Sequence, residues 1–391
     1  MPDDRDAIAL RIVERIADIP AAEWDACAGQ DAPDANPFVA HAFLSALEES
    51  GSVGREAGWM PHHLVLDGSD GRLAAAVPLY IKSHSQGEYV FDWGWADAFE
   101  RAGGRYYPKL QAAVPFTPVA GPRLLARPGP DRDRLRAALA AGLVEAVKRY
   151  GVSSAHVTFA PEDEARFLAE RGFLLRVDHQ YHWHNRGYGS FDDFLGALSS
   201  RKRKMIRKER EQVAAAGVSF RVLDGHEAGP AEWDAFFRFY VDTYDRKWGY
   251  PYLTREFFEI AAATMPDRIA LVLAYADGRP IAGAINYVGR DGLFGRNWGA
   301  VEQYKFLHFE TCYYQAIDYA IRRGLQRVEA GTRGPHKIQR GYEPVPTFSA
   351  HWIADPGFRD AVARFLERER AAEDHERRQL VEFLPYRQEN A

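Results

Sequence analysis

A histidine, a glutamate and a tyrosine stand together where an amphipathic helix is expected to begin. His308, Glu310 and Tyr313 fall in the segment LHFETCYYQAIDYAI. Apolar residues recur in it at helical spacing, so one face packs on a core. A helix N-terminus favours the neutral form of a histidine, so His308 is the predicted base, with Glu310 orienting it or deprotonating an amine through water. The other interpretation is a helix-capping polar pair with no reaction to run.

The strand expected before this helix ends in a short glycine-containing sequence. Arg296, Trp298 and Gly299 lie in RNWGA. The N–H groups at the start of the following helix are expected to meet a phosphate-bearing donor. The segment partly resembles the Arg/Gln-x-x-Gly-x-Gly/Ala loop of CoA-binding GNAT proteins, and this resemblance makes the three residues the predicted donor-binding set.

Acidic, aromatic and histidine residues also gather within fourteen positions of the N-terminal half. Aromatic faces beside carboxylates suit a sugar, or an amine held by a cation–π contact. The alternative is structural, with the tryptophans in a core and the acids paired with Arg101, Arg105 or Lys109. The predicted substrate-binding residues in this segment are His84, Glu88, Asp92, Trp93, Trp95 and Asp97.

A pair of histidines raises the question of a metal. His182 and His184 alternate on an expected strand, so both side chains share one face and two ligands are geometrically compatible. A third ligand is not evident nearby in the sequence, and ordinary histidines near a sheet edge are the favoured interpretation. The sequence predicts no metal site.

The overall composition excludes several classes of protein. The chain has 391 residues, a net charge of −5 and a pI near 6.2, which argues against a DNA-binding surface. Cys27 and Cys312 are too few and too far apart for a disulfide framework. Acidic residues stand where a signal peptide needs positive charge, and no apolar run reaches the length of a spanning helix. We expect a cytoplasmic protein that does not span a membrane.

The chain repeats itself. The segment 64–80, LVLDGSDGRLAAAVPLY, aligns with 271–287, LVLAYADGRPIAGAINY, with eight identities in seventeen positions. Both copies read as strand, Asp-Gly turn and strand. Upstream, AEWDA at 22–26 recurs at 231–235, each at the start of an expected helix.

Further landmarks keep the same order in both copies. Expected helices end at Gly151 and Gly324, and an Arg-Gly-aromatic sequence follows each, ending at Phe173 and Tyr342. The first copy carries extra residues rich in proline and aromatic side chains, about 98–130, which predict an ordered loop wall. The order of elements resembles the GNAT acyltransferase fold.

The predicted fold class is α/β (α+β), with two tandem GNAT-like domains that each hold a mixed, mostly antiparallel sheet flanked by helices. The first domain covers 1–189 and contains the insertion. A basic helix, 190–217, joins it to the second domain, 218–391, which ends in a helix. The basic run RKRKMIRKER is interpreted as solvated, with apolar residues docking the helix; a phosphate or anionic-lipid contact is the functional alternative.

Four longer segments carry a more specific resemblance. They are HSQGEYVFDWGWADAFERAGGRYYPKLQAAVPFTPVAGPRLL from His84, LHFETCYYQAIDYAI from Leu307, GTRGPHKIQRGYEPVPTFSAHWI from Gly331, and KRKMIRKER. Together they resemble the peptidoglycan biosynthesis/recognition family of predicted N-acyltransferases, a FemAB-related group, over nearly the whole chain.

The resemblance implies transfer of an acyl or aminoacyl group to an amine, with acyl-CoA or aminoacyl-tRNA as co-substrate. The acceptor is then a small-molecule amine or a peptidoglycan precursor, and tRNA is a partner only as donor carrier. In place of the family's Gly-Ala-Gln-Gly-Glu-His-Lys, this chain has Thr332, Arg333 and Pro335, while His336 and Lys337 match.

Two classes of function follow. The chain is predicted to be an N-acyltransferase, with Arg333, His336 and Lys337 binding substrate in a cleft between the copies. Lys337 and Arg333 are expected to hold anionic groups of the substrate, with His308 and Glu310 at the reacting amine. The alternative is a non-catalytic module that binds a peptidoglycan fragment or a protein on a degenerate acyltransferase fold.

Overall fold

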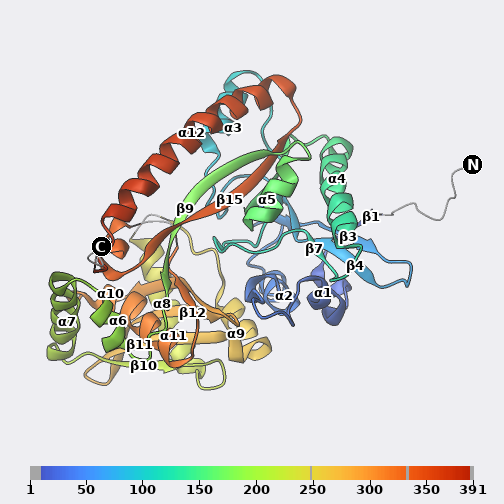
Figure 1. Ribbon diagram of the computed structural model, residues 1–391. Coiled ribbons are helices and arrows are strands. Elements are labelled where there is room, and N and C mark those ends of the chain that lie inside the picture. Colours follow the sequence, from blue (N-terminus) through green and yellow to red (C-terminus); the bar gives the residue numbers. More distant parts are fainter. Residues whose placement is uncertain (1–9, 247–248, 332–333, 388–391) are drawn as a thin grey trace, which may run out of the picture. The chain divides into compact units, whose positions relative to one another are not determined.

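Two compact units divide the chain in this computed structural model, which describes residues 10–246, 249–331 and 334–387. The first unit is Met1–Asp178 with Thr347–Ala372, and the second is His179–Pro346 with Glu373–Ala391. The units therefore interleave along the chain, whereas the sequence analysis divided it into consecutive segments. Figure 1 shows the elements of both units.

The first unit holds two groups of paired strands. One has the order β1-β3-β4-β7, and the other has the order β15-β8-β6-β5-β2. Its elements are β1 (Leu10–Val13), α1 (Ala21–Cys27), α2 (His41–Glu49), β2 (Trp59–Pro61), β3 (His63–Asp67), β4 (Leu73–Val77), β5 (Leu79–Lys82), α3 (Trp93–Arg101), β6 (Lys109–Ala112), β7 (Leu125–Ala126), α4 (Arg132–Tyr150), β8 (Ser154–Ala160), α5 (Glu162–Ala169) and the start of β9 (Leu174–His184).

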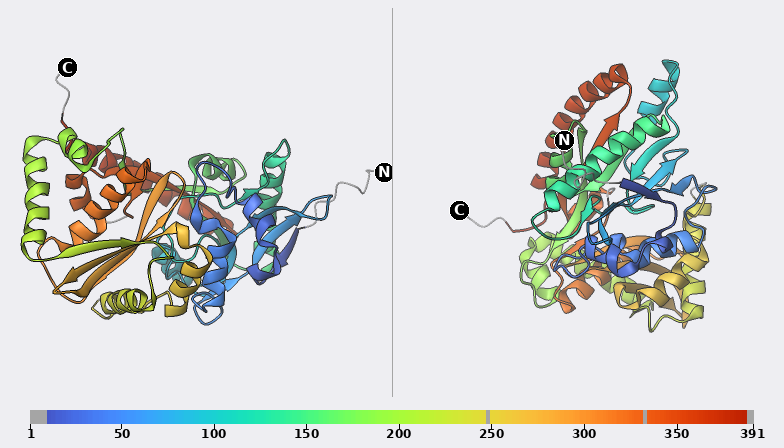
Figure 2. Two further views of the ribbon diagram at one scale, coloured as in Figure 1. Left: turned by 90° about the horizontal axis from the view of Figure 1, so that it is seen from below. Right: turned by 90° about the vertical axis from the view of Figure 1, so that its right-hand side faces the viewer.

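The second unit holds the strand order β10-β11-β12-β13-β14-β9. Helix α8 lies on one face of this sheet and α11 on the other (Figure 2). Its elements are α6 (Phe191–Ala197), α7 (Ser200–Ala215), β10 (Ser219–Leu223), α8 (Pro230–Asp245), α9 (Arg255–Thr264), β11 (Ile269–Ala276), β12 (Arg279–Val288), β13 (Gly292–Ala300), α10 (Leu307–Phe309), the π-helical turn η5 (Glu310–Tyr314), α11 (Gln315–Arg322), β14 (Arg327–Glu329) and the 3-10 helix η6 (Pro335–Arg340). Strand β15 (Glu343–Ile353) and helix α12 (Pro356–Glu382) each pass from one unit to the other.

The structure confirms the predicted α/β fold of mixed, mostly antiparallel sheets flanked by helices. Both predicted hairpins form, as β3–β4 and as β11–β12. Helix α4 ends at Gly151 in the left-handed conformation, which glycine adopts without steric penalty. The glycines of the two Arg-Gly-aromatic sequences, Gly172 and Gly341, have nearly equal positive φ angles of 90° and 89°.

The two copies differ at one point of the hairpin. In the first copy Pro78 separates β4 from β5, and the two short strands belong to different sheets. Proline cannot donate to a strand ladder, so pairing is interrupted there. In the second copy the equivalent strand β12 is continuous, and its pairing with β13 shifts between Ile285 and Asn286. This irregularity lies at the candidate site.

The last strand of each repeat completes the sheet of the other compact unit. In the first unit β8 pairs antiparallel with β15, from Ser154↔Ile353 to Ala160↔Phe348. In the second unit β14 pairs antiparallel with β9, with Val328 opposite Trp183. The two compact units therefore do not coincide with the consecutive domains, 1–189 and 218–391, predicted from the sequence.

The basic segment differs from the single joining helix expected for 190–217. It forms two helices of the second unit, because the chain leaves helical geometry at Leu198 and bridges to Tyr386. Helix α7 buries Ile206 and Val213, as the docking interpretation requires. Most of its Lys and Arg side chains reach solvent, where water solvates their charges.

Candidate functional site

Strands β13 and β14 run parallel and separate after three residues. Their pairing covers Gly292–Phe294. On its other edge β13 pairs with β12, where Asn286 lies opposite Gly295 and Ile285 opposite Asn297, so Arg296 is an extra residue of β13. A bulge of this kind re-aims side chains and breaks regular pairing. Beyond Phe294, β13 no longer pairs with β14, and its residues from Gly295 to Trp298 line a cavity.

The cavity has a volume of about 250 Å³. It lies within the second unit and is walled by β12, β13, the helical segment from His308, and η6. Its lining residues are Ala284, Ile285, Asn286, Gly295, Arg296, Asn297, Trp298, His308, Cys312, Tyr313, Ala330, His336 and Lys337.

Several residues predicted separately from sequence meet at this cavity. The predicted residues among its walls are Arg296, Trp298, His308, Tyr313, His336 and Lys337. Arg333 lies outside the described residues. Sequence reasoning missed Asn286, although a polar residue in an otherwise apolar strand was a usable signal; its side-chain amide donates to the Ala270 carbonyl at 3.2 Å.

Tyr313 and His336 form a polar pair of side chains in the wall. The Tyr313 hydroxyl lies 3.0 Å from Nε2 of His336. Burial raises the pKa of Tyr313 above its usual value, so the hydroxyl stays protonated and donates to the imidazole. Burial, with Arg340 and Lys337 adding to it, lowers the pKa of His336, which favours a neutral ring. The His308 ring packs edge-on against Tyr313, with centroids 5.3 Å apart.

Lys337 is buried at the foot of the cavity and is 5% exposed. Its Nζ donates to the carbonyl oxygens of Ala330 at 2.6 Å and Gly331 at 3.2 Å. The Tyr181 ring lies 5.4 Å from Nζ. Burial lowers the pKa of Lys337 to about 8, because removal from water disfavours the charged ammonium.

Glu310 does not line the cavity. Its carboxylate is buried and accepts hydrogen bonds from Arg210, at 3.0 Å, and from Gln315, at 2.8 Å. The carboxylate therefore joins α7 to the π-helical turn. The predicted partnership with His308 stays a prediction.

Gly299 also faces away from the cavity, toward α8. A Cβ there would overlap the main chain of Phe239, so glycine permits the close approach of strand and helix. A neighbouring cavity of about 360 Å³ shares Trp298 and His308 with the first and extends to Thr243, Arg246 and Glu302. This second cavity lies at the helix start where a donor phosphate was expected.

The predicted residues of the first unit separate into a buried and an exposed set. Trp95 is buried against His351, with ring centroids 5.0 Å apart. Asp97 is exposed and pairs with Arg101 at 2.7 Å. Trp93 is 53% exposed. The Nδ1 atom of His84 accepts from the main-chain N–H of Gln86 at 3.2 Å.

Glu88 and Asp92 belong to a buried charged network. Lys109 Nζ donates to Glu88 at 2.8 Å and to Asp92. The hydroxyl of Tyr106 donates to Asp92 at 2.6 Å. Burial raises the pKa of Glu88 to about 7. The pairing of both acids with Lys109 matches the structural alternative in the sequence analysis, and their role in binding stays a prediction.

The amino-acid sequence matches a known protein family. The FemAB-like family, described as peptidoglycan biosynthesis/recognition, matches residues 15–388. The chain belongs to the FemAB-like family. The family match spans the residues of both cavities and of the buried Lys109 network.

Solved structures share the fold of this FemAB-like chain at low sequence identity. FemX is 11% identical with a TM-score of 0.56, covering 88% of this chain and 98% of FemX. A C-terminal domain assigned to lysylphosphatidylglycerol synthetase from Agrobacterium fabrum is 11% identical with a TM-score of 0.53, covering 88% and 95%. L-PGS from Bacillus licheniformis is 10% identical with a TM-score of 0.50, covering 85% and 98%. Comparison with the curated proteins finds no match.

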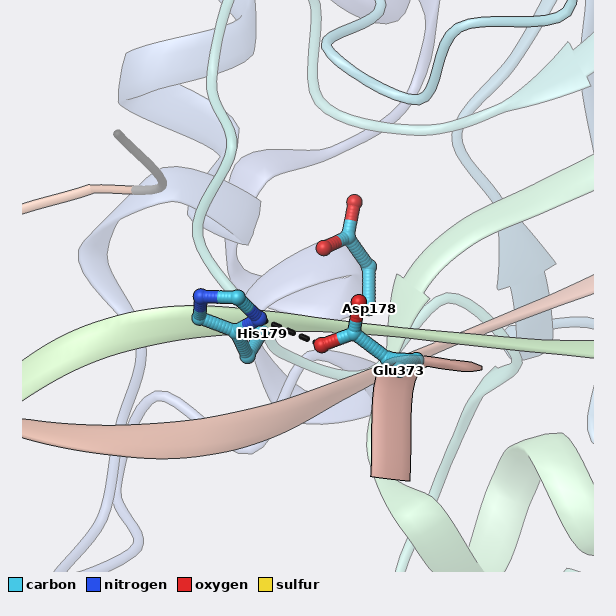
Figure 3. A group of neighbouring side chains, drawn as sticks. All are labelled: Asp178, His179 and Glu373. Carbon is cyan, nitrogen blue, oxygen red and sulfur yellow. Dashed lines mark hydrogen bonds and ion pairs between the residues drawn. The ribbon is translucent and has the colours of Figure 1, made fainter. Parts of the chain in front are cut away.

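A pair of side chains in the second unit bears on the metal question. His179 Nδ1 and a Glu373 carboxylate oxygen form an ion pair (Figure 3). Asp178, the residue before His179, is the third side chain drawn and can join a metal-binding group with this pair. Because Glu373 already engages the imidazole, we assign no ion to this group. Nε2 of His182 lies 3.6 Å from a carboxylate oxygen of Glu329 across the β9–β14 pair.

The length and polarity of its helices bear on whether the chain crosses a membrane. Among residues 10–246, 249–331 and 334–387, every helix is too short or too polar to cross a membrane.

Proposed function

We propose that this FemAB-like chain is an N-acyltransferase whose reaction takes place in the 250 Å³ cavity of the second unit. One observation carries the proposal. The side chains of His308, Tyr313 and His336 converge on the cavity at the point where β13 leaves β14. Side chains able to transfer protons thus face one space, as acyl transfer requires.

The chemistry assigns a role to each group. The neutral His336 imidazole takes the proton of the attacking amine, with His308 as the other candidate base. The amine nitrogen bonds to the acyl carbon, and the carbonyl oxygen becomes an oxyanion that accepts from main-chain N–H groups of the bulged β13. Tyr313 gives a proton to the leaving group as the bond to the donor breaks, and His336 returns a proton to Tyr313 through their hydrogen bond.

The donor is acyl-CoA or aminoacyl-tRNA. Its phosphate-bearing part enters the neighbouring cavity, which shares Trp298 and His308 with the reaction cavity. The fold of FemX and L-PGS supports a transferase, and the family description supports a cell-wall precursor as acceptor.

A non-catalytic binding module is the second candidate. No Asp or Glu side chain contributes to the cavity wall in the part of the chain that the structure describes. The sequence has Pro335 where the related motif has an acid. Loss of a catalytic acid with retention of the groove is the pattern expected of a binding protein.

An assay of acyl transfer distinguishes the N-acyltransferase from the non-catalytic binding module. Purified protein is incubated with acetyl-CoA, longer acyl-CoAs and charged tRNAs together with a panel of amines, and products are followed by mass spectrometry. The test variants are Tyr313→Phe, His336→Gln and His308→Ala. The control is His226→Gln, since His226 is exposed and distant in sequence from the cavity wall.

We expect transfer from one donor class, with losses of roughly 100-fold for Tyr313→Phe and His336→Gln and no change for the control. Binding of wall fragments without transfer from any donor, unaffected by the three cavity substitutions, contradicts the enzyme and supports the binding module.

A further inference from the structure

Lys337 places a buried positive charge in the reaction cavity without a carboxylate beside it. An ammonium has three N–H donors, and two of them are directed at the carbonyls of Ala330 and Gly331. These partners are neutral. In the part of the chain that the structure describes, Lys337 forms no ion pair with Asp or Glu. A buried charge of this kind is costly unless a counter-ion is supplied.

Among the described residues, the rest of the cavity wall holds no Asp or Glu to supply the missing negative charge. Arg296 adds a second cation to the wall. Burial raises the pKa of the Cys312 thiol, so the thiol stays neutral beside Lys337. The nearest acids along the chain are already engaged, because Glu343 holds Arg186 at 2.7 Å and Glu329 holds Arg327 at 2.9 Å.

One acid lies in the adjoining cavity rather than in this one. Glu302 lines the second cavity, where its carboxylate is 3.5 Å from Arg279. The Tyr304 hydroxyl donates to the same carboxylate at 3.4 Å. Among the described residues that line them, the cavity with Tyr313 and His336 has Arg296 and Lys337 and no acid, whereas the second cavity has both Arg246 and Glu302.

Resting on the proposed function, we propose that the reaction cavity binds a carboxylate carried by one of the two substrates, which contacts Lys337 Nζ on the wall that also holds Arg296. A charge-assisted hydrogen bond of this type is stronger in a desolvated site than in water. The same wall disfavours a substrate that brings an ammonium group into the cavity.

Either of the two substrates can carry this carboxylate. It belongs either to the acyl group of the donor or to the molecule that carries the acceptor amine. Matched probes separate them. Succinyl-CoA, butyryl-CoA and β-alanyl-CoA have acyl groups of similar length that end in a carboxylate, a methyl and an ammonium. As acceptors, 6-aminohexanoate and hexylamine differ in the same way at the end remote from the amine.

Binding of each probe is measured by calorimetry on the full chain, so the result does not depend on turnover. The variant is Lys337→Met, which keeps the length of the side chain without its charge. The matched control is Lys208→Met, since Lys208 is exposed on α7. Circular dichroism confirms that both variants fold.

We expect succinyl-CoA or 6-aminohexanoate to bind about tenfold or more tightly than its neutral partner, and β-alanyl-CoA to bind most weakly among the thioesters. Lys337→Met removes that preference and Lys208→Met retains it. Preference for succinyl-CoA identifies the donor as the source, and preference for 6-aminohexanoate identifies the acceptor.

Equal binding of charged and neutral partners in both arms, or a preference that survives Lys337→Met, overturns the carboxylate site. Failure of acyl transfer with the carboxylate preference intact overturns the proposed reaction and leaves the site standing. The two proposals therefore fail separately.

Discussion

Burial changes the pKa of two adjacent residues of the 3-10 helix η6, His336 and Lys337, with a different consequence for each. Burial disfavours the charged form of each, so the pKa of both is lowered. For His336 the result is a neutral ring across the physiological range, which is the form a base requires. For Lys337 it is a cation held at a free-energy cost that a bound anion would offset.

The pH dependence of transfer tests the role of His336. Its pKa lies below the usual 6.5, so the base-competent form persists as pH falls to that value and is lost only below it. We expect kcat/KM to fall on the acidic side as pH drops through this lowered pKa, below 6.5. His336→Gln is expected to lose this acidic limb together with roughly 100-fold in rate. A limb that persists in His336→Gln belongs to another group and contradicts the assignment.

The stability of Lys337→Met tests the cost of the buried charge. Between the folded pKa of about 8 and the usual 10.5, the folded chain binds fewer protons at this site than the unfolded chain. Stability therefore rises with pH across that window, and the penalty is fully present below it. We expect Lys337→Met to be more stable at pH 7 by on the order of 1–3 kcal/mol, with the difference shrinking towards pH 10.5.

Urea unfolding at both pH values measures this difference, with Lys208→Met as the control that should not change. Equal destabilisation of Lys337→Met at pH 7 and pH 10.5 would show instead that the hydrogen bonds to Ala330 and Gly331 outweigh the buried charge.

At the scale of elements, the helix that carries the candidate residues is not uniform. Residues Glu310–Tyr314 form a π-helical turn between α10 and α11. Such turns insert a residue into the helix and recur at functional sites. Here Glu310 pairs with Arg210 of α7, while Tyr313 reaches His336 of η6. The regular helix expected from the apolar spacing does not describe this turn.

The packing of β13 on α8 gives a second test at this scale. A methyl group on Gly299 would overlap the main chain of Phe239, which cannot move without displacing α8. We expect Gly299→Ala to destabilise the chain by roughly 2–3 kcal/mol, measured by thermal unfolding. Gly196→Ala in α6 is the control, because a methyl there meets open space and should stabilise by about 0.5–1 kcal/mol. Equal effects of the two substitutions would contradict the close approach.

At the scale of the whole chain, each compact unit depends on a segment from the other repeat. Strand β8 of the first unit pairs with β15 across 188 residues or more of sequence, as in Ala160↔Phe348. Strand β14 of the second unit pairs with β9 in the same manner. An unpaired strand edge is a liability, so neither repeat is expected to be stable as a consecutive piece.

Expression of residues 1–189 alone tests this dependence. Without β15 and α12, the edge of β8 has lost its partner and part of the apolar core is exposed. We expect the fragment to aggregate or to unfold without a cooperative transition, and co-expression with residues 190–391 to restore a folded complex. A fragment 1–189 that is monomeric and unfolds cooperatively would support the consecutive domains expected from sequence.

The sequence by itself determined the features that depend on neighbouring residues. The repeat, the two hairpins and the helix end at Gly151 follow from local alternation, turn chemistry and glycine conformation, and the structure confirms them. The sequence also supplied six of the thirteen residues that line the 250 Å³ cavity, among them His308 and Tyr313 on one helical segment and His336 and Lys337 on another.

Only the tertiary structure decided which of these residues meet. Apolar periodicity shows that a strand or helix has a buried face and leaves its partner open, since pairing and burial join segments far apart in the chain. The 3.0 Å approach of Tyr313 to His336, the commitment of Glu310 to Arg210 and the exchange of β9 and β15 between units all depend on such long-range partners. The charge of Lys337 was visible in the sequence, but its lack of a counter-ion became evident only when the walls of the cavity were known.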